Sequence, residues 1–304
     1  MNPQTRTTLT AITFALIACI LWSGNFVVAR GVHEWMNPIG FAFWRWVTAL
    51  IVIIPLALPH YRTNIIYFKQ NPKVYIAMGV LGVGIFNTLV YESAKYTSAN
   101  NVALLAATSP IWTLFLAGIF KIDILNRNRI IGIFTAFAGA LTIVSKGDIS
   151  LLLHMNFNIG DLMMFIASWL WAIYSLLLKF KHREMNSFFL MSLIIFFGLC
   201  VITPLYAIEI AYIGYTPFST KALYSYLYVG IGASVIAWYL FNQSVFMIGP
   251  VRTSLIYYTM PIFSGIMSII FLGEHFYRYH IAGFVLVLSG IVVSNLRTKS
   301  KELL

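Results

Sequence analysis

The chain is poor in charged residues. Asp, Glu, Lys and Arg together make up 10% of its 304 residues, and only nine residues are acidic. A water-soluble domain carries about 25% charged residues, so this composition excludes an ordinary soluble fold. Hydrophobic residues instead make up 60% of the chain. The sequence is therefore typical of an integral membrane protein.

Cysteine is also scarce. The two cysteines, Cys19 and Cys200, both lie within apolar runs, which argues against an extracellular disulfide and against a cysteine-based metal site. All six histidines fall in predicted loops or at predicted helix ends, whereas a membrane-embedded metalloenzyme needs acids and histidines clustered at depth. We therefore expect neither a metal nor a cofactor.

The net charge of +11 would suggest nucleic acid as the partner of a soluble protein. Here almost all the basic residues lie between apolar runs, as the loop charges of membrane proteins do. We therefore expect the lipid bilayer as the surroundings of the chain, no nucleic acid and no obligate protein partner.

Long apolar runs separated by short loops dominate the chain. A helix that crosses a membrane needs about 20 mostly apolar residues, each adding about 1.5 Å. The runs predict ten spans, at 9–29, 39–59, 73–94, 100–120, 128–145, 159–179, 187–208, 222–246, 250–272 and 279–296. The first run lacks the short apolar core and the small-residue cleavage site of a signal peptide, so we expect it to be retained as a helix.

The basic residues are distributed unevenly between the two sides of these spans. Fourteen lie on the side of the N-terminus and five on the other side. Because Lys and Arg accumulate in cytoplasmic loops, we expect both termini in the cytoplasm and the spans in the inner (plasma) membrane.

The second half of the chain repeats the first. A shift of 151 residues aligns residues 75–146 with residues 226–297, and 15 of these 72 positions are identical. The identical positions include prolines, glycines and a helix-end arginine, which shared hydrophobicity alone would not readily match. Each half then holds five spans. An odd number of spans forces the halves into opposite orientations, which is the inverted-repeat plan of secondary transporters.

Four stretches of the sequence, taken together, are specific enough to indicate a protein family. They are LWSGNFVVAR (21–30), FWRWVTAL (43–50), YESAKYTSANNVALLAATSPIW (91–112) and PIFSGIMSIIFLGEHFYRYHIAGFVLVLSGI (261–291). With them the chain resembles, over nearly its whole length, the EamA-type transporters of the drug/metabolite transporter superfamily. The first half departs from the family pattern, because Lys121-Ile-Asp123 stands where the Gly273-Glu274 pair would be expected.

The resemblance implies an all-α integral membrane protein with ten transmembrane helices in two inverted five-helix repeats around a central cavity. The repeats would cover residues 9–145 and 159–296. Spans 1, 3, 4, 6, 8 and 9 would line the cavity, and the other spans would buttress it. The resemblance also implies a secondary transporter that exports amino acids or other small metabolites across the inner membrane.

Other functions stay open at this point. An enzyme acting on a lipid-linked substrate is the main alternative, although it would need a deep cluster of acids or histidines. A channel or a receptor fits poorly with an inverted repeat. A pair of duplicated structural bundles without transport activity is a further alternative.

If those six spans line a cavity, their polar and aromatic side chains are the candidate solute-binding residues. They are Trp22, Asn25, Asn87, Tyr91, Glu92, Trp112, Trp171, Tyr174, Trp238, Tyr239, Asn242 and Tyr258. Tyr and Trp offer an apolar face with one hydrogen-bonding group, which suits a small amphipathic solute. Each aromatic has an alternative role in the core or in the interfacial belt. A buried cluster of Lys and Arg for phosphates is missing, so a neutral or zwitterionic solute fits best.

Four residues are candidates for a structural or gating role: Arg45, Pro110, Pro261 and Glu274. The prolines occupy matched positions, and we expect them to kink spans 4 and 9 because proline breaks the helical hydrogen-bond ladder. Glu92 is a carboxylate predicted inside a cavity-lining span, near the outer end of span 3. It either pairs with Lys95, contacts a substrate ammonium group or carries a coupling proton. Proton coupling has no other support, since span 1 contains no acid.

Arg45 lies between two tryptophans, about 10 Å inside the outer boundary of span 2. An arginine in hydrocarbon costs from about 3 to more than 10 kcal/mol, so this side chain needs partners. We predict that it turns inward and braces the outer half of the bundle through helix-end carbonyls, with Glu92 as an ionic partner. The alternative is that it extends outward to the lipid headgroups.

Overall fold

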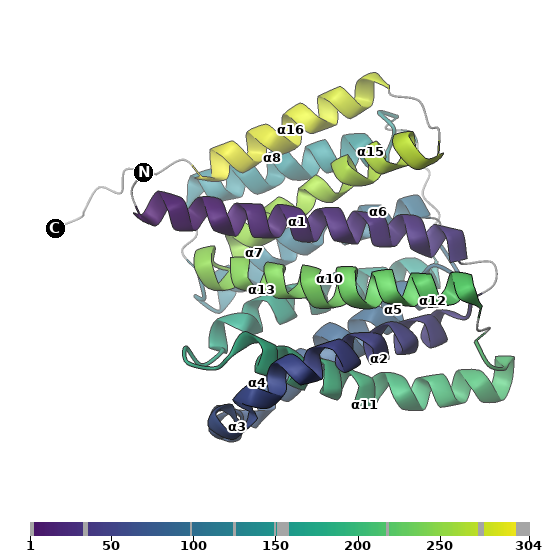
Figure 1. The fold of residues 1–304 in the computed structure, drawn as a ribbon. Helices are drawn as coiled ribbons and strands as arrows, with labels where there is room; N and C mark the ends of the chain where they lie inside the picture. The colour runs from purple at the N-terminus through teal and green to yellow at the C-terminus, as the bar shows by residue number, and fades with distance from the viewer. Residues whose placement is uncertain are drawn as a thin grey trace.

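The structure, a computed structural model, describes residues 3–32, 36–97, 99–123, 126–148, 150, 158–216, 219–272 and 277–295. The regular secondary structure of these ranges is entirely helical (Figure 1). The first half contains α1 (Pro3–Val32), α2 (Pro38–Ala57), η1 (Leu58–His60), α3 (Tyr61–Gln70), α4 (Pro72–Ala77), η2 (Met78–Ile85), α5 (Phe86–Ser93), α6 (Ala99–Ala106), α7 (Ser109–Ile119) and α8 (Arg127–Val144). The second half contains α10 (Ile159–Leu177), η3 (Leu178–Phe180), α11 (Ser187–Ile213), α12 (Thr220–Leu227), η4 (Tyr228–Ile236), α13 (Ala237–Ile248), α14 (Pro250–Ile256), η5 (Tyr257–Thr259), α15 (Met260–Leu272) and α16 (Arg278–Asn295).

These elements form ten spans, as predicted. Eight helical stretches of the described residues are long and apolar enough to cross a membrane. The ninth span is the broken series α14–η5–α15, and the tenth is α16. The first turn of α1 and the last turn of α16 lie at the same end of the bundle, on the left of Figure 1.

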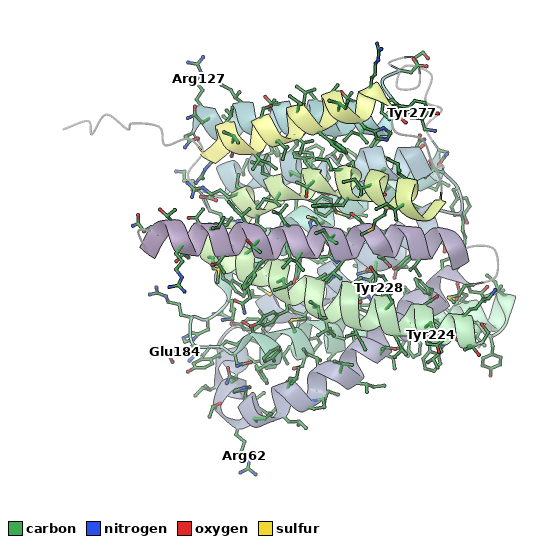
Figure 2. The ribbon with its side chains drawn as sticks, turned by 45° about the horizontal axis from the view of Figure 1, so that its top comes forward. Arg62, Arg127, Glu184, Tyr224, Tyr228 and Tyr277 are labelled. Atoms are coloured by element: carbon green, nitrogen blue, oxygen red, sulfur yellow. The ribbon has the colours of Figure 1, made fainter. Side chains whose placement is uncertain are left out.

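The two ends of the bundle differ in the side chains that they present (Figure 2). Arg62, Arg127 and Glu184 lie at the end where α1 begins, and Tyr224 and Tyr277 lie at the opposite end. The lateral surface between them is apolar. Ile51 and Ile270, for example, are 66% and 68% exposed, which suits side chains that face lipid.

The seventh span is longer than predicted, because α11 continues past residue 208 to Ile213. The extension carries Glu209, whose carboxylate is buried and accepts the backbone N–H groups of Ile39 (3.0 Å) and Gly40 (2.7 Å). These groups lie in the first turn of α2, where backbone N–H groups have no helical partner and the helix dipole favours a negative charge. The boundary prediction was wrong because two backbone N–H groups of α2 stabilise this acid within the bundle.

The internal repeat appears in the irregularities of the helices. The third and eighth spans both widen into π-helical turns, at η2 and η4, and the shift of 151 residues superimposes these segments. The fourth and ninth spans both break, between α6 and α7 and at η5. Because π-helical turns are rare in any helix, their occurrence at matched positions shows that the repeat is structural.

The fifth and tenth spans pack through glycines that the repeat relates to each other. A Cβ atom on Gly132 would lie 2.5 Å from the carbonyl oxygen of Gly290, and one on Gly290 would lie 2.5 Å from that of Gly132. Gly139 and Gly283 approach each other in the same way, at 2.7 and 2.8 Å. Gly132 of α8 meets Gly290 of α16, and Gly139, further along α8, meets the earlier Gly283. The two helices are therefore antiparallel. The two halves therefore have opposite orientations.

Candidate solute-binding site

Aromatic rings from both halves meet in one group, which we call the central aromatic cluster. Its members are Trp22, Phe86, Trp171, Tyr174, Trp238, Phe241 and Tyr257. Trp171 of α10 is its centre, since its ring centroid lies between 5.1 and 6.2 Å from those of the other six. These separations are typical of aromatic pairs in van der Waals contact.

The central aromatic cluster lies where the first helix of each half packs against the other half. Helix α1 of the first half packs against α13 and α15 of the second, and α10 of the second half packs against α5 and α7 of the first. Trp22 and Trp171 each follow a leucine in the first span of their half. Their rings meet edge to face, 5.3 Å apart at 84°. The contact therefore lies on the boundary between the repeats.

The polar groups of Trp22, Trp171 and Tyr174 and of the neighbouring Asn242 are buried at the cluster. The indole N–H of Trp22 donates to the carbonyl of Ala233 (2.8 Å), and the Tyr174 hydroxyl donates to Asn242 Oδ1 (2.9 Å). By contrast, Trp171 Nε1 and Asn242 Nδ2 have no acceptor among the residues that the structure describes. A buried donor without an acceptor costs about 1–3 kcal/mol. Such groups are suited to a ligand that brings acceptors of its own.

Next to this cluster, Arg45 turns into the bundle and binds the third and eighth spans. Its Nε donates to Ser234 Oγ at 2.6 Å, and Nη1 donates to the Tyr91 hydroxyl at 2.6 Å. Two longer contacts, both 3.4 Å, run from Nη1 to Asn87 Oδ1 and from Nη2 to the carbonyl of Ala233. The side chain is 4% exposed. We call Arg45, Asn87, Tyr91 and Ser234 the arginine cluster.

The two clusters share one atom. The carbonyl oxygen of Ala233 accepts both the Trp22 indole N–H and the long contact from Arg45. Ala233 lies in the π-helical turns of η4, where the backbone pairing differs from that of a regular α-helix and functional sites are frequent. The indole N–H of Trp22 and the guanidinium of Arg45 therefore meet at one backbone oxygen.

The profile of the EamA-like transporter family matches residues 9–145 and 158–296. The chain belongs to this family. It is 25% identical to the uncharacterized transporter YyaM of Bacillus subtilis (strain 168), over 91% of this chain and 90% of that one. A riboflavin transporter of Brucella anthropi is 26% identical over 157 residues, about half of each chain. A solved crystal structure shares the fold, with a TM-score of 0.75 at 16% identity, over 96% of this chain and 98% of that chain.

Membership of the EamA family confirms the resemblance drawn from the sequence motifs and assigns the chain to the drug/metabolite transporter superfamily. The family consists of transporters, so the chain is a membrane transporter and not an enzyme acting on a lipid-linked substrate. Within the described ranges, no three His, Cys, Asp or Glu side chains group together in a way that would hold a metal ion.

The structure does not bring every candidate of this EamA chain to the centre. Trp112 packs on Trp169, with centroids 4.5 Å apart, and Tyr239 stacks on Phe188 at 5.0 Å. Tyr258 is buried, and its nearest ring partner is Phe137, at 6.2 Å. Solute binding by these three residues stays a prediction.

Asn25 and the acidic candidates have different positions. Asn25 is half-buried, and its Oδ1 has no donor among the described residues. Glu92 forms a salt bridge with Lys95 at 2.8 Å, which confirms the first of its three predicted roles, so the ion pair with Arg45 is wrong. Lys95, three residues after Glu92 in the sequence, binds the Glu92 carboxylate instead. Glu274 lies outside the described residues.

Pro110 and Pro261 follow the two helix breaks directly, at the starts of α7 and α15. Corresponding hydroxyls bind corresponding carbonyls at the breaks: Thr108 Oγ1 donates to Leu105, and Thr259 Oγ1 donates to Ile256. The first span of each half adds a second donor. Ser168 Oγ reaches the Leu105 carbonyl at 2.7 Å, and Cys19 Sγ reaches that of Ile256 at 3.6 Å. These bonds satisfy backbone acceptors that the broken ladder leaves free.

Sequence reasoning missed two members of the central aromatic cluster, Phe86 and Phe241. No feature of the sequence separates Phe86 or Phe241 from ordinary core phenylalanines. Tyr257 stands next to the predicted Tyr258, and the turn at η5 decides which of the two rings faces Trp22. The repeated Leu-Trp pair was the signal available for the centre of the site.

Proposed function

We propose that this EamA transporter is a secondary transporter that exports small neutral or zwitterionic metabolites, such as amino acids, across the inner membrane. Both termini would then lie in the cytoplasm, and residues 9–145 and 159–296 would form the two repeats. The central aromatic cluster is the observation that carries the proposal. It combines apolar rings from both halves with two buried donors that lack acceptors.

The chemistry of this cluster favours a small amphipathic solute. Rings of Trp, Tyr and Phe pack against an apolar side chain, while Trp171 Nε1 and Asn242 Nδ2 would donate to its polar end. Each bond formed by a solute would recover part of the cost of about 1–3 kcal/mol per unsatisfied donor. The solute therefore gains affinity from groups that the protein leaves unpaired.

The symmetry of the helix breaks supports alternating access. In this structure the rings pack closely on one another, so they must separate to admit a solute. Breaks at matched places, before Pro110 and Pro261, give each half one point at which a span can bend. Because the two halves have opposite orientations, bending one break or the other would open the site toward opposite sides of the membrane.

A planar heteroaromatic solute is the second candidate class. The central aromatic cluster contains seven rings, which is compatible with stacking on a flat ring system. The relative from Brucella anthropi is named a riboflavin transporter. Riboflavin therefore belongs in the test beside the amino acids.

The proposal is tested by uptake into proteoliposomes that contain the purified full chain. The solute pool should contain amino acids, nucleosides and riboflavin, and each uptake should be measured with and without a pH gradient. We expect the accumulation of at least one solute above protein-free liposomes. Stimulation by the gradient would assign proton coupling. If no solute of the pool crosses, the proposed solute classes are wrong.

A further inference from the structure

Arg45 carries a charge that the described part of the protein does not neutralise. Arginine stays protonated in proteins, and this side chain is 4% exposed. All four of its hydrogen-bond partners, from Ser234, Tyr91, Asn87 and Ala233, are neutral groups. The ring of Trp46, whose centroid lies 5.0 Å from Cζ, adds a cation–π contact but no negative charge. A buried charge without an anion is unfavourable relative to the same charge with an anion beside it.

The acids of the described residues are engaged elsewhere. They are Glu92, Asp123, Asp148, Asp161, Glu184 and Glu209. Glu92 and Asp123 form salt bridges with Lys95 and Arg129. Asp161 and Glu209 accept hydrogen bonds at the starts of α10 and α2, while Asp148 and Glu184 are exposed. An anion for Arg45 would therefore have to come from outside these residues.

Because no described acid pairs with this charge, we infer that Arg45 binds the carboxylate group of the transported solute. This inference rests on the proposed function and narrows its solutes to amino acids and other monocarboxylates. The guanidinium lies next to the central aromatic cluster through the shared carbonyl of Ala233. Tyr91, whose hydroxyl accepts from Nη1, is half-buried.

The contacts of Arg45 divide into a fixed set and an exchangeable set. The two bonds of 2.6 Å, to Ser234 and Tyr91, hold the guanidinium plane in place. The two contacts of 3.4 Å are weak and lie one on each terminal nitrogen, Nη1 and Nη2. Terminal nitrogens can take both oxygens of a carboxylate at once. The solute carboxylate replaces these two contacts while the short bonds remain.

A carboxylate fits this arrangement better than a phosphate. Arg45 is the single basic residue of the arginine cluster, and Lys95 is paired with Glu92. One guanidinium matches one planar monoanion, whereas phosphate sites usually assemble several basic groups or backbone donors. The solute's apolar part then lies against Trp22 and Trp171, whose rings are 5.3 Å apart.

The test compares pairs of probes that differ only in the carboxylate. Suitable pairs are L-phenylalanine with L-phenylalaninamide, L-leucine with L-leucinamide, and 3-phenylpropionate with 3-phenylpropionamide. Binding of each probe is measured on the purified full chain by thermal stabilisation, and each ratio of acid to amide affinity is calculated. In the natural protein, we expect at least one acid to bind about tenfold or more tightly than its amide, since the bonds to it are charge-assisted.

Three variants assign this preference to the charge of Arg45. Arg45→Gln keeps donors but loses the charge, so the ratio should fall to about one. Arg45→Lys keeps the charge in a poorer geometry, so a reduced preference for the acid should remain. The control, Arg62→Gln, removes an exposed arginine of α3 that points away from the bundle (Figure 2) and should leave the ratio unchanged.

Several results would overturn the inference. The inference is wrong if the natural protein binds acid and amide equally, prefers the amides or binds no acid. These results need only the natural protein, so they count even if Arg45→Gln does not fold. A preference that survives in Arg45→Gln would also exclude the charge as its cause. If the uptake assay shows transport of neutral solutes while the acids do not bind, the proposed transport stands and the role of Arg45 falls. If no solute of the pool crosses, the proposed function falls first.

Discussion

Gly132→Ala should destabilise the protein, because it places a methyl group inside the contact between α8 and α16. The new Cβ would lie 2.5 Å from the Gly290 carbonyl oxygen and 2.8 Å from the backbone nitrogen of Ser294. Backbone atoms do not move aside as flexible side chains do, so the helices must separate. Overpacking of this kind costs about 1–3 kcal/mol, whereas alanine in place of glycine favours a helix by about 1 kcal/mol.

Gly265→Ala is the matched control. Gly265 also lies in a helix, α15, but the nearest atom to its added Cβ is a His280 side-chain atom at 3.5 Å, an ordinary van der Waals distance. This variant should gain up to about 1 kcal/mol from helix propensity. The difference between the two variants therefore isolates the clash. In detergent, heating followed by size-exclusion chromatography should give a lower midpoint for Gly132→Ala and an equal or higher midpoint for Gly265→Ala.

The double variant Gly132→Ala/Gly290→Ala sharpens the comparison. Each glycine faces the carbonyl of the other at 2.5 Å, so one separation of the helices relieves both clashes. The combined loss of stability should therefore be smaller than the sum of the single losses. A Gly132→Ala protein as stable as the Gly265→Ala control would refute the close packing of the two repeats at this contact.

Two further predictions concern topology and Arg45. A reporter fused after Leu304 should be active only in a cytoplasmic assay, because Lys and Arg accumulate in the loops at the N-terminal end; a periplasmic signal would contradict the proposed orientation. Arg45→Lys should lower thermal stability nearly as much as Arg45→Ala, since one ammonium group cannot reproduce the two 2.6 Å bonds of the guanidinium fork. A lysine variant as stable as the natural protein would show that Arg45 does not brace α2 against the third and eighth spans.

The sequence predicted features that depend on composition and on local order along the chain. Apolar run length sets the number of spans, and matched prolines and glycines reveal the repeat. The breaks before Pro110 and Pro261 follow from the missing N–H and the ring of proline. These signals are carried by single residues and their spacing, so one sequence was sufficient.

Contacts between distant segments were harder to predict. The repeat relates Gly132 to Gly283, but only the packing of the two helices shows that Gly132 faces Gly290. The sequence alone assigns Glu209 to a loop. Its buried position follows only from the packing of α2 beside α11. Which residues meet across two helices depends on the rotation and shift of each helix, and these are set by the whole bundle.

Arg45 shows both sides of this limit. The cost of a charge in hydrocarbon predicts that the side chain needs partners. The identity of the partners is not local information. Glu92 was a reasonable candidate from its depth, but Lys95 lies closer to it along the chain. The hydroxyls of Ser234 and Tyr91, on two other spans, take its place at the guanidinium.

The most direct test of the account is transport by variants of Trp171, the centre of the contact between the two halves. Trp171→Leu and Asn242→Leu should each reduce proteoliposome uptake of the identified solute at least tenfold, while the purified variants remain monodisperse. The control, Trp44→Leu, removes an exposed indole of α2 outside the central aromatic cluster and should retain most of the activity. Full transport by Trp171→Leu and Asn242→Leu, or equal losses in all three variants, would contradict a solute site between the repeats.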